Sequence, residues 1–299
     1  TDESQNKIYL RPETAQGEFV NFLNVQRTTR AKVPFGIAQI GKAFRNEITP
    51  GNFIFRTIEF EQMEHQWFCK EGTDQEYYAE YKKRAWQFLL NLGFKEEHLR
   101  FHDHDKLAHY AKAACDIQYD FPMGWSELNG IHNRTDYDLS RHQEYSGKSM
   151  MYVDPVTQER YIPYVIEYSI GADRLMLAAL SEAYDEETLE NGEVRNVMRF
   201  HPAIAAYKAA VLPLQKGLAP QAKELLAKLK KHFLVTYDEA GSIGKRYRRQ
   251  DEIGTPYCIT IDFDTLENNS VTVRDRDTMA QIRLDIDEVA PYIEKTLEH

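Results

Sequence analysis

The sequence predicts an α+β fold in two domains, an antiparallel sheet with flanking helices followed by a smaller α/β domain with a mixed sheet. Segments of strand composition dominate the first two thirds of the 299 residues, and strands alternate with helices in the last third. An acidic segment, Glu182–Arg199, separates the two regions and is interpreted as a linker. We therefore expect one domain at residues 1–198 and a second at residues 199–299.

The individual elements follow from composition, periodicity and turn residues. In the first domain we expect strands at residues 33–47, 55–68, 124–134 and 161–168. Helices are expected at residues 14–26, 75–92, 106–114 and 171–184, with an inserted subdomain at about 70–122. In the second domain the expected strands are 209–212, 234–237, 257–263 and 271–274, and the expected helices are 219–233 and 242–252.

Composition excludes several classes of protein. The net charge of −10 argues against a general basic coat for nucleic acid, although it allows a local basic patch. Three cysteines lie far apart without a CxxC pair, which supports neither a disulfide framework nor a cysteine zinc site. This cysteine usage fits a reducing compartment, so we expect a cytoplasmic protein. No apolar run reaches the length that a transmembrane helix needs.

The segment FRNEITPGNFIFRTIEFEQMEHQWF, residues 44–68, carries unusual charge for a half-buried hairpin. Because side chains alternate across a strand, Arg45 and Glu47 share one face, and Arg56, Phe60, Gln62 and Glu64 share a face of the return strand. Turn residues at 49–52 join the two strands. Surface charge on a solvated sheet is the simpler interpretation, but the many aromatic residues of the segment favour a polar pocket.

Five ordered segments carry a family resemblance. Residues 44–64 resemble the second signature motif of class II aminoacyl-tRNA synthetases, the glycyl type in particular. The segment before that hairpin in the family is similar to residues 9–17 (YLRPETAQG), and the family's core strand and following loop are similar to residues 124–142. The third motif, a strand that runs into a helix, is similar to residues 165–180 (VIEYSIGADRLMLAAL). Residues 241–278 resemble the anticodon-binding domain of the same family. The resemblance implies ATP-dependent activation of glycine to glycyl-adenylate, with Mg²⁺, and transfer of the glycyl group to tRNA(Gly).

The implied nucleotide site is rich in arginine, which binds carboxylate and phosphate bidentately. By resemblance, Arg45 bridges the amino-acid carboxylate and the α-phosphate, Arg174 holds the far phosphates, and these two are the catalytic residues. Glu127 is expected to act through magnesium, and Phe60 to stack on adenine. The implied ATP contacts are Arg45, Asn46, Glu47, Phe55, Arg56, Phe60, Glu127, Leu128, Gly171 and Arg174.

The implied amino-acid site is crowded with carboxylates. Such a cluster is unfavourable when empty and is satisfied when an ammonium group arrives, and it leaves little room for a side chain. The positions that match the family's glycine site are Glu13, Phe60, Glu61, Gln62, Glu64, Glu167, Ser169 and Gly171.

The basic run KRYRR is the candidate tRNA contact. A run this short is most often a solvated helix face, but cations beside an aromatic residue also suit phosphate contact and base stacking. Its place in the resembled domain favours the anticodon loop, which would contact Lys245, Arg246, Tyr247, Arg248 and Arg249.

The sequence also departs from the family pattern. Residues that differ from the expected type are Glu18, Gly51, Ile58, His65, His132 and Tyr168. The family's first motif, which builds a homodimer interface, would lie before Thr1, so we expect a fragment. The parent family is homodimeric, and the sequence leaves the oligomeric state of this chain open.

Two alternatives and one metal hypothesis stay open at this point. The chain could be a non-catalytic accessory protein that binds nucleic acid on a synthetase scaffold, or an impaired fragment that still binds ATP. His102, His104 and His109 lie near Asp103 and Asp105, where a metal site is conceivable but a polar surface of the inserted subdomain is favoured.

Overall fold

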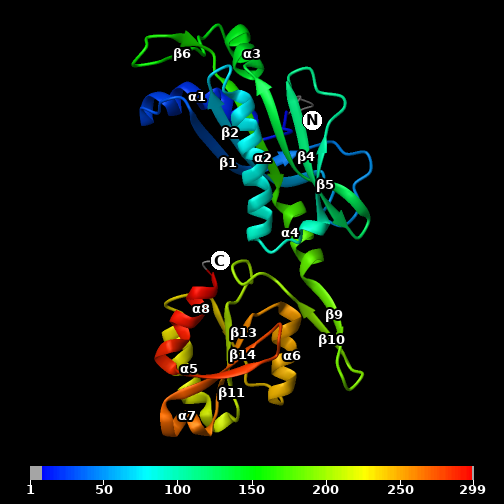
Figure 1. Ribbon diagram of the computed structural model, residues 1–299, viewed down its shortest axis with the longest axis vertical. Coiled ribbons are helices and arrows are strands. Elements are labelled where there is room, and N and C mark those ends of the chain that lie inside the picture. Colours follow the sequence, from blue (N-terminus) through cyan, green and yellow to red (C-terminus); the bar gives the residue numbers. More distant parts are fainter. Residues whose placement is uncertain (1–8, 298–299) are drawn as a thin grey trace, which may run out of the picture. The chain divides into compact units, whose positions relative to one another are not determined.

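A computed structural model describes residues 9–297 and divides the chain into two compact units (Figure 1). The first unit holds the described residues up to Leu90 together with Lys95–Ala178, and the second holds Asn91–Phe94 and the chain from Ala179 onward. The change from one unit to the other therefore falls within a helix, before the boundary near residue 198 that the sequence predicts.

The first unit is built on a six-stranded sheet whose strand order is β1-β2-β8-β5-β4-β3 and whose neighbouring strands are all antiparallel. This confirms the predicted α+β class and antiparallel sheet. The elements are α1 (Ala15–Thr29), β1 (Phe35–Phe44), β2 (Glu59–Cys69), α2 (Asp74–Asn91), β3 (Leu99–Asp103), β4 (Ala113–Phe121), β5 (Gly124–Thr135), α3 (Tyr137–Ser146), β6 (Tyr152–Val153), β7 (Arg160–Tyr161), β8 (Tyr164–Gly171) and α4 (Ala172–Ala183).

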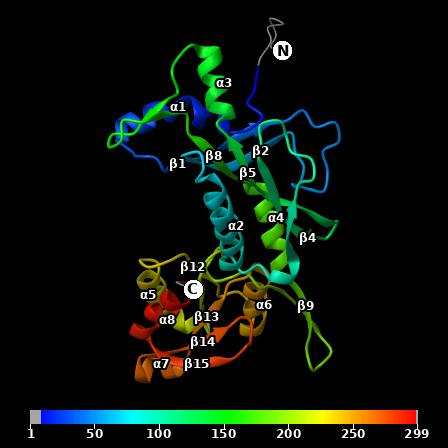
Figure 2. The same cartoon turned by 45° about the horizontal axis from the view of Figure 1, so that its top comes forward.

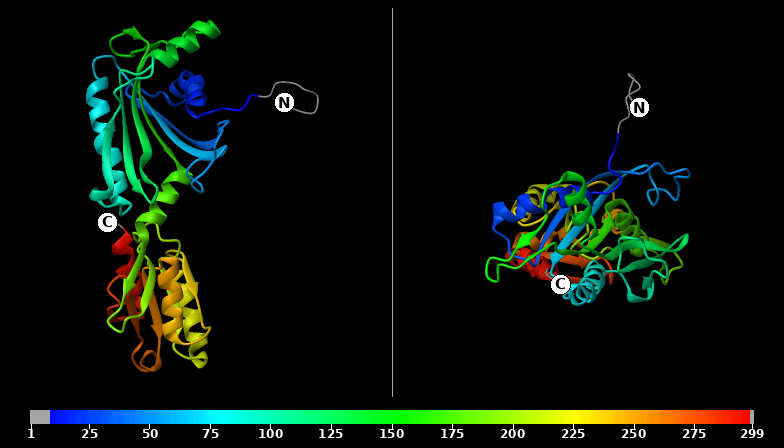
Figure 3. Two further views of the ribbon diagram at one scale, coloured as in Figure 1. Left: turned by 90° about the vertical axis from the view of Figure 1, so that its right-hand side faces the viewer. Right: turned by 90° about the horizontal axis from the view of Figure 1, so that it is seen from above.

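Two helices cover opposite faces of this sheet, as the left view of Figure 3 shows. On one face Phe22 of α1 packs against Phe68 of β2, with ring centroids 4.6 Å apart. On the other face Tyr77 of α2 lies 5.7 Å from Trp67, the preceding residue of β2. Alternation along β2 therefore directs adjacent side chains to different helices.

The second unit contains a five-stranded sheet of order β12-β11-β13-β14-β15, and α5 and α8 lie on one side of it with α6 on the other (Figure 2). The strand β11 pairs in parallel with both of its neighbours and the remaining pairs are antiparallel, which confirms the predicted mixed sheet. The elements are β9 (Tyr184–Thr188), β10 (Val194–Met198), β11 (Ala209–Pro213), α5 (Ala219–Leu229), β12 (Val235–Tyr237), α6 (Ile243–Ile253), β13 (Tyr257–Ile261), α7 (Phe263–Asn268), β14 (Ser270–Asp275), β15 (Gln281–Asp285) and α8 (Val289–Leu297).

Three local predictions are wrong. The helix expected at 106–114 is absent from the described chain, because Ala113 starts β4 and pairs with Asn133 of β5, and this pairing overrides local helix propensity. The acidic linker is instead the antiparallel hairpin β9–β10. The return strand expected from residue 55 starts at Glu59, since Gly51 and Arg56 exchange two backbone hydrogen bonds in a separate turn.

Candidate active site

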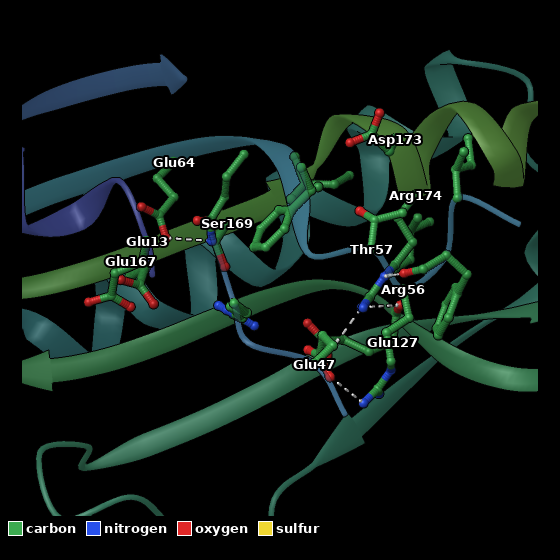
Figure 4. A pocket seen from close by; sticks show the side chains of 18 of the residues that line it. Glu13, Glu47, Arg56, Thr57, Glu64, Glu127, Glu167, Ser169, Asp173 and Arg174 are labelled. Carbon is green, nitrogen blue, oxygen red and sulfur yellow. Dashed lines mark hydrogen bonds and ion pairs between the residues drawn. The ribbon is translucent and has the colours of Figure 1, made fainter. Parts of the chain in front are cut away.

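A cavity of about 240 Å³ opens in the first unit, between the β1–β2 connection and the ends of β5, β8 and α4. Figure 4 shows two groups of side chains in it, with Glu13, Glu64, Glu167 and Ser169 at one end and Glu47, Arg56, Glu127 and Arg174 at the other. The cavity is lined by Glu13, Arg45, Glu47, Ile54, Phe55, Arg56, Thr57, Phe60, Gln62, Glu64, Tyr110, Glu127, Leu128, His132, Arg134, Glu167, Ser169, Ile170, Gly171, Asp173 and Arg174.

At the end that holds Arg56 and Arg174, each guanidinium group is paired with a carboxylate. Arg56 Nη1 lies 3.3 Å from Glu47 Oε2, and Arg174 Nη1 lies 3.3 Å from Glu127 Oε2. These pairs are partly solvated, and such ion pairs contribute only about 0–1 kcal/mol each. A polyanionic ligand can therefore replace the carboxylates at little cost.

Aromatic rings orient the same cations. The guanidinium carbon of Arg174 lies 4.2 Å from the centroid of the Phe55 ring, and that of Arg45 lies 5.3 Å from the Phe60 ring. Arg45 Nε also donates to the backbone carbonyl of Pro12 at 3.1 Å. This hydrogen bond uses only the Nε–H of the guanidinium, so the Nη N–H groups of Arg45 can serve an anion in the cavity.

At the opposite end, Glu167 is buried and fully engaged. His132 Nδ1 lies 2.8 Å from its Oε1, while Arg134 Nη1 at 2.7 Å and Gln66 Nε2 at 2.9 Å donate to its Oε2. Burial opposes ionisation, but the His132 hydrogen bond and the charges of Arg134 and His132 outweigh it and lower the pKa of Glu167 to about 2. Glu167 is therefore a carboxylate throughout the neutral range.

Glu64 is buried as well, but its partners are neutral. The Thr14 hydroxyl and the Gln62 amide donate to its two oxygens, the latter at 2.8 Å. Burial and the charge of Glu167 raise the pKa of Glu64 to about 7. No ion pair to Glu64 occurs within residues 9–297. An ammonium group arriving here would supply the missing cation.

Two predicted site residues lie outside the cavity lining, Asn46 and Glu61. Glu61 is exposed on β2, where its backbone N–H donates to Asp173 Oδ2 at 3.0 Å. Sequence reasoning missed the lining residues Tyr110 and Arg134. On β5, Arg134 lies two residues after His132, so their side chains point to the same face of the strand. This alternation is the sequence signal that could have placed His132 and Arg134 together in the cavity. The other lining residues without a predicted role are Ile54, Thr57, His132, Ile170 and Asp173.

In the second unit, the basic run lies on α6, and most of its side chains form hydrogen bonds within the fold. Arg246 is 4% exposed and donates to backbone carbonyls of Pro213 and Gly241. The Tyr247 hydroxyl bonds Thr260 Oγ1 at 2.7 Å, and Arg249 Nε bonds Asp238 at 2.8 Å. Of the predicted tRNA contacts, Lys245 is the most open.

The histidine-rich segment has ordinary polar contacts. His104 Nε2 lies 2.7 Å from Asp116 Oδ2, and His109 Nε2 lies 3.0 Å from the Tyr137 hydroxyl. In the part of the chain that the structure describes, no three His, Cys, Asp or Glu side chains are grouped to hold a metal ion. Nor does any helix between residues 9 and 297 combine the length and apolarity needed to cross a membrane.

Comparison with known proteins identifies both parts of the chain. Residues 1–183 match the family described as tRNA synthetase class II core domain (G, H, P, S and T), and residues 208–296 match the family described as anticodon binding domain. Relatives named glycine–tRNA ligase from Clostridium kluyveri and Clostridium perfringens are each 64% identical over all of this chain, and one from Geobacillus kaustophilus is 61% identical over 99% of it. The chain spans 65% of the length of these curated relatives. It belongs to the class II tRNA synthetase family whose core domain it carries.

Proposed function

We propose that this chain is a glycine–tRNA ligase, which activates glycine with ATP and transfers the glycyl group to tRNA(Gly). The observation that carries the proposal is the cavity with arginines at one end and crowded carboxylates at the other. The relatives that share 60–64% of its residues bear this name. A non-catalytic accessory role is not favoured, because Arg45, Glu64, Glu167 and Arg174 all line one cavity.

The arginine end would bind ATP and stabilise the transition state of activation. The glycine carboxylate attacks the α-phosphate of ATP and pyrophosphate leaves, so negative charges must be brought together and balanced. Arg45 would bridge the two reacting groups, and Arg174 would hold the leaving pyrophosphate. Arg56 would contact the nucleotide from the hairpin while Phe60 stacks on adenine. The remaining proposed ATP contacts are Asn46, Glu47, Phe55, Leu128 and Gly171.

Glu127 is the proposed magnesium ligand. Mg²⁺ is usually bound by one or two carboxylates together with substrate phosphates, rather than by a cage of protein side chains. Glu127, whose carboxylate is half exposed beside Arg174, fits that type of site. When bound, the ion would neutralise phosphate charge.

The carboxylate end would hold the ammonium group of glycine. Glu64 forms no ion pair in the described chain, whereas Glu167 already has hydrogen bonds to Arg134 and His132. We therefore assign the main ammonium contact to Glu64, with Glu13, Glu167 and Ser169 around it. The other proposed contacts are Phe60, Glu61, Gln62 and Gly171.

The C-terminal part would bind the anticodon loop of tRNA(Gly). Lys245 is the side chain of the basic run that is best placed to meet a phosphate, and Arg248 is partly open beside Glu193 at 3.4 Å. The proposed division into domains at 1–198 and 199–299, the cytoplasmic location and the oligomeric state stay predictions.

Glycine-dependent exchange of pyrophosphate into ATP tests the function directly. We expect exchange with glycine and little with alanine or serine, because the carboxylates leave scant room for a side chain. Equal exchange with all three amino acids would refute the glycine assignment, and none with any of them would refute activation by this chain.

Replacing Arg45 by Ala should lower the exchange rate by about 10³-fold or more, since a preorganised charge on the reacting groups is lost. Arg45 is exposed, so circular dichroism should show an unchanged fold. Arg141→Ala is the matched control, because Arg141 is an exposed residue of α3 outside the cavity lining. A rate for Arg45→Ala close to that of Arg141→Ala would remove Arg45 from the mechanism.

A further inference from the structure

His132 is the one departure from the family pattern that lines the cavity. Glu18, Gly51, Ile58, His65 and Tyr168 do not appear among the lining residues, whereas the His132 side chain belongs to the wall formed by β5. The family resemblance assigns His132 no role. Its contacts indicate what it contributes.

The first contact is a hydrogen bond to the buried carboxylate. His132 and Glu167 are direct cross-strand partners in the pairing of β5 with β8, and His132 Nδ1 lies 2.8 Å from Glu167 Oε1. Because Glu167 is ionised and can only accept, the imidazole must carry its proton on Nδ1. Arg134 and Gln66 hold the other oxygen, so His132 alone among the described residues restrains Oε1.

The second contribution is volume. A Cβ atom placed on Gly130 would lie 3.1 Å from His132 Cε1, 3.2 Å from its Nε2 and 3.4 Å from Ser169 Oγ. The imidazole ring and the Ser169 hydroxyl therefore both lie close to Gly130, and both His132 and Ser169 line the cavity. The ring therefore takes up volume beside Gly130 on this wall of the cavity.

Charged groups from several strands face the ring. Glu167 comes from β8, Asp116 from β4 and Arg134 from β5, and the centroid of the His104 ring lies 6.2 Å away. His104 in turn holds Asp116 at 2.7 Å. Burial lowers the pKa of His132, but the bond to Glu167 and the charges of Glu167 and Asp116 outweigh burial and raise it.

We propose that His132 is a positioning and specificity-determining residue, which holds Glu167 in place for the substrate ammonium group and fills the space that a larger amino acid would use. The inference rests on the proposed function, since it concerns the same site. The two roles depend on different properties of the side chain: positioning depends on the Nδ1–H donor, and specificity depends on the volume of the ring.

Two variants separate these properties. In His132→Asn the side-chain amide keeps a donor near the place of Nδ1 but removes much of the ring, whereas His132→Ala removes both. We expect the Asn variant to keep a glycine KM within about threefold of the parent chain and to gain about tenfold in alanine exchange relative to glycine exchange. The Ala variant should show the same gain and a glycine KM raised about tenfold, with a smaller change in kcat.

The exchange assay can overturn each half. An Ala variant whose glycine KM stays within twofold of the parent overturns the positioning role, and unchanged alanine-to-glycine ratios in both variants overturn the specificity role. A fall in kcat without a change in KM or in the ratios overturns both, because that pattern indicates a general loss of structure rather than a loss of contacts to glycine.

A readout without catalysis distinguishes this inference from the proposed function. If the parent chain exchanges no pyrophosphate with glycine, the proposed function fails, and nitrogen NMR of the His132 imidazole still tests positioning. We expect Nδ1 to be protonated in the parent chain and the pKa of His132 to fall in Glu167→Gln, with Glu13→Gln as a control that leaves it nearly unchanged. A pKa that is equal in Glu167→Gln and the parent overturns the positioning role.

Discussion

Glu18 is a buried carboxyl group at a position where the sequence departs from the family pattern. It lies in the first turn of α1, is 1% exposed, and neither of its oxygens has a hydrogen-bond partner of normal geometry in the described chain. Burial and the nearby charges of Glu64 and Glu167 raise its pKa to about 9, although the Gln66 backbone amide acts in the opposite direction. The folded protein therefore keeps this group protonated at neutral pH.

The stability of the parent chain should consequently fall relative to Glu18→Gln as the pH rises from 4.5 to 9. Over this range the unfolded chain has released the Glu18 proton and the folded chain retains it. The free energy of unfolding therefore falls by about 1.4 kcal/mol for each pH unit, which amounts to about 3 kcal/mol at pH 7. Denaturant unfolding at several pH values measures the difference. Parallel pH profiles for the two proteins would show that Glu18 ionises normally in the fold.

At the scale of elements, the hairpin β9–β10 is anchored to α6 by buried charge. Arg195 of β10 is 1% exposed, and it lies 2.9 Å from Asp251 of α6 and 2.7 Å from Glu187 of β9. Arg274 of β14 donates to the same Asp251 at 2.9 Å. Charged residues of the segment that the sequence suggests is a linker are therefore used in tertiary contacts. Local sequence patterns cannot distinguish such a segment from a solvated one, because its partners lie elsewhere in the chain.

The close packing of β10 on the end of α6 makes Gly254 sensitive to substitution. Gly254 caps α6 with a φ of +78°, and a Cβ there would overlap the Phe200 ring and lie 2.9 Å from the Met198 carbonyl oxygen. Gly254→Ala should cost about 3 kcal/mol in the free energy of unfolding, from backbone strain and overlap together.

Gly192→Ala is the matched control, because Gly192 has a φ of +82° in the same unit with no atom within 4 Å of its added Cβ. It should cost only about 1 kcal/mol. Equal losses of stability for the two variants in thermal unfolding would mean that β10 does not pack tightly against the end of α6.

At the scale of the whole molecule, each unit has a hydrophobic core of its own. The first includes Phe19, Phe22, Phe68 and Val165, and the second is centred on β11, β13, α5 and α8. The entire cavity belongs to the first unit. Cores that share few residues commonly unfold in separate transitions.

Calorimetry should therefore show ATP and glycine raising the stability of one transition. At a ligand concentration 100 times Kd the gain is about 2.7 kcal/mol, because only the folded first unit binds. Arg45→Ala should abolish most of this shift. If both transitions moved together with ligand, the two units would unfold as one cooperative body and the prediction would be wrong.

Strand alternation, turn residues and ordered motifs within the sequence predicted both sheets, most of their strands and the charged hairpin, because these signals depend on neighbours along the chain. The strand order and register came only from the tertiary structure, since pairing β5 with β8 is a long-range contact. That register places His132 opposite Glu167 and brings Arg134 to the same carboxylate. Burial separates groups that look equivalent in sequence: Arg246 is bound by carbonyls within the fold while its neighbour Lys245 faces solvent, because the two point to different sides of α6.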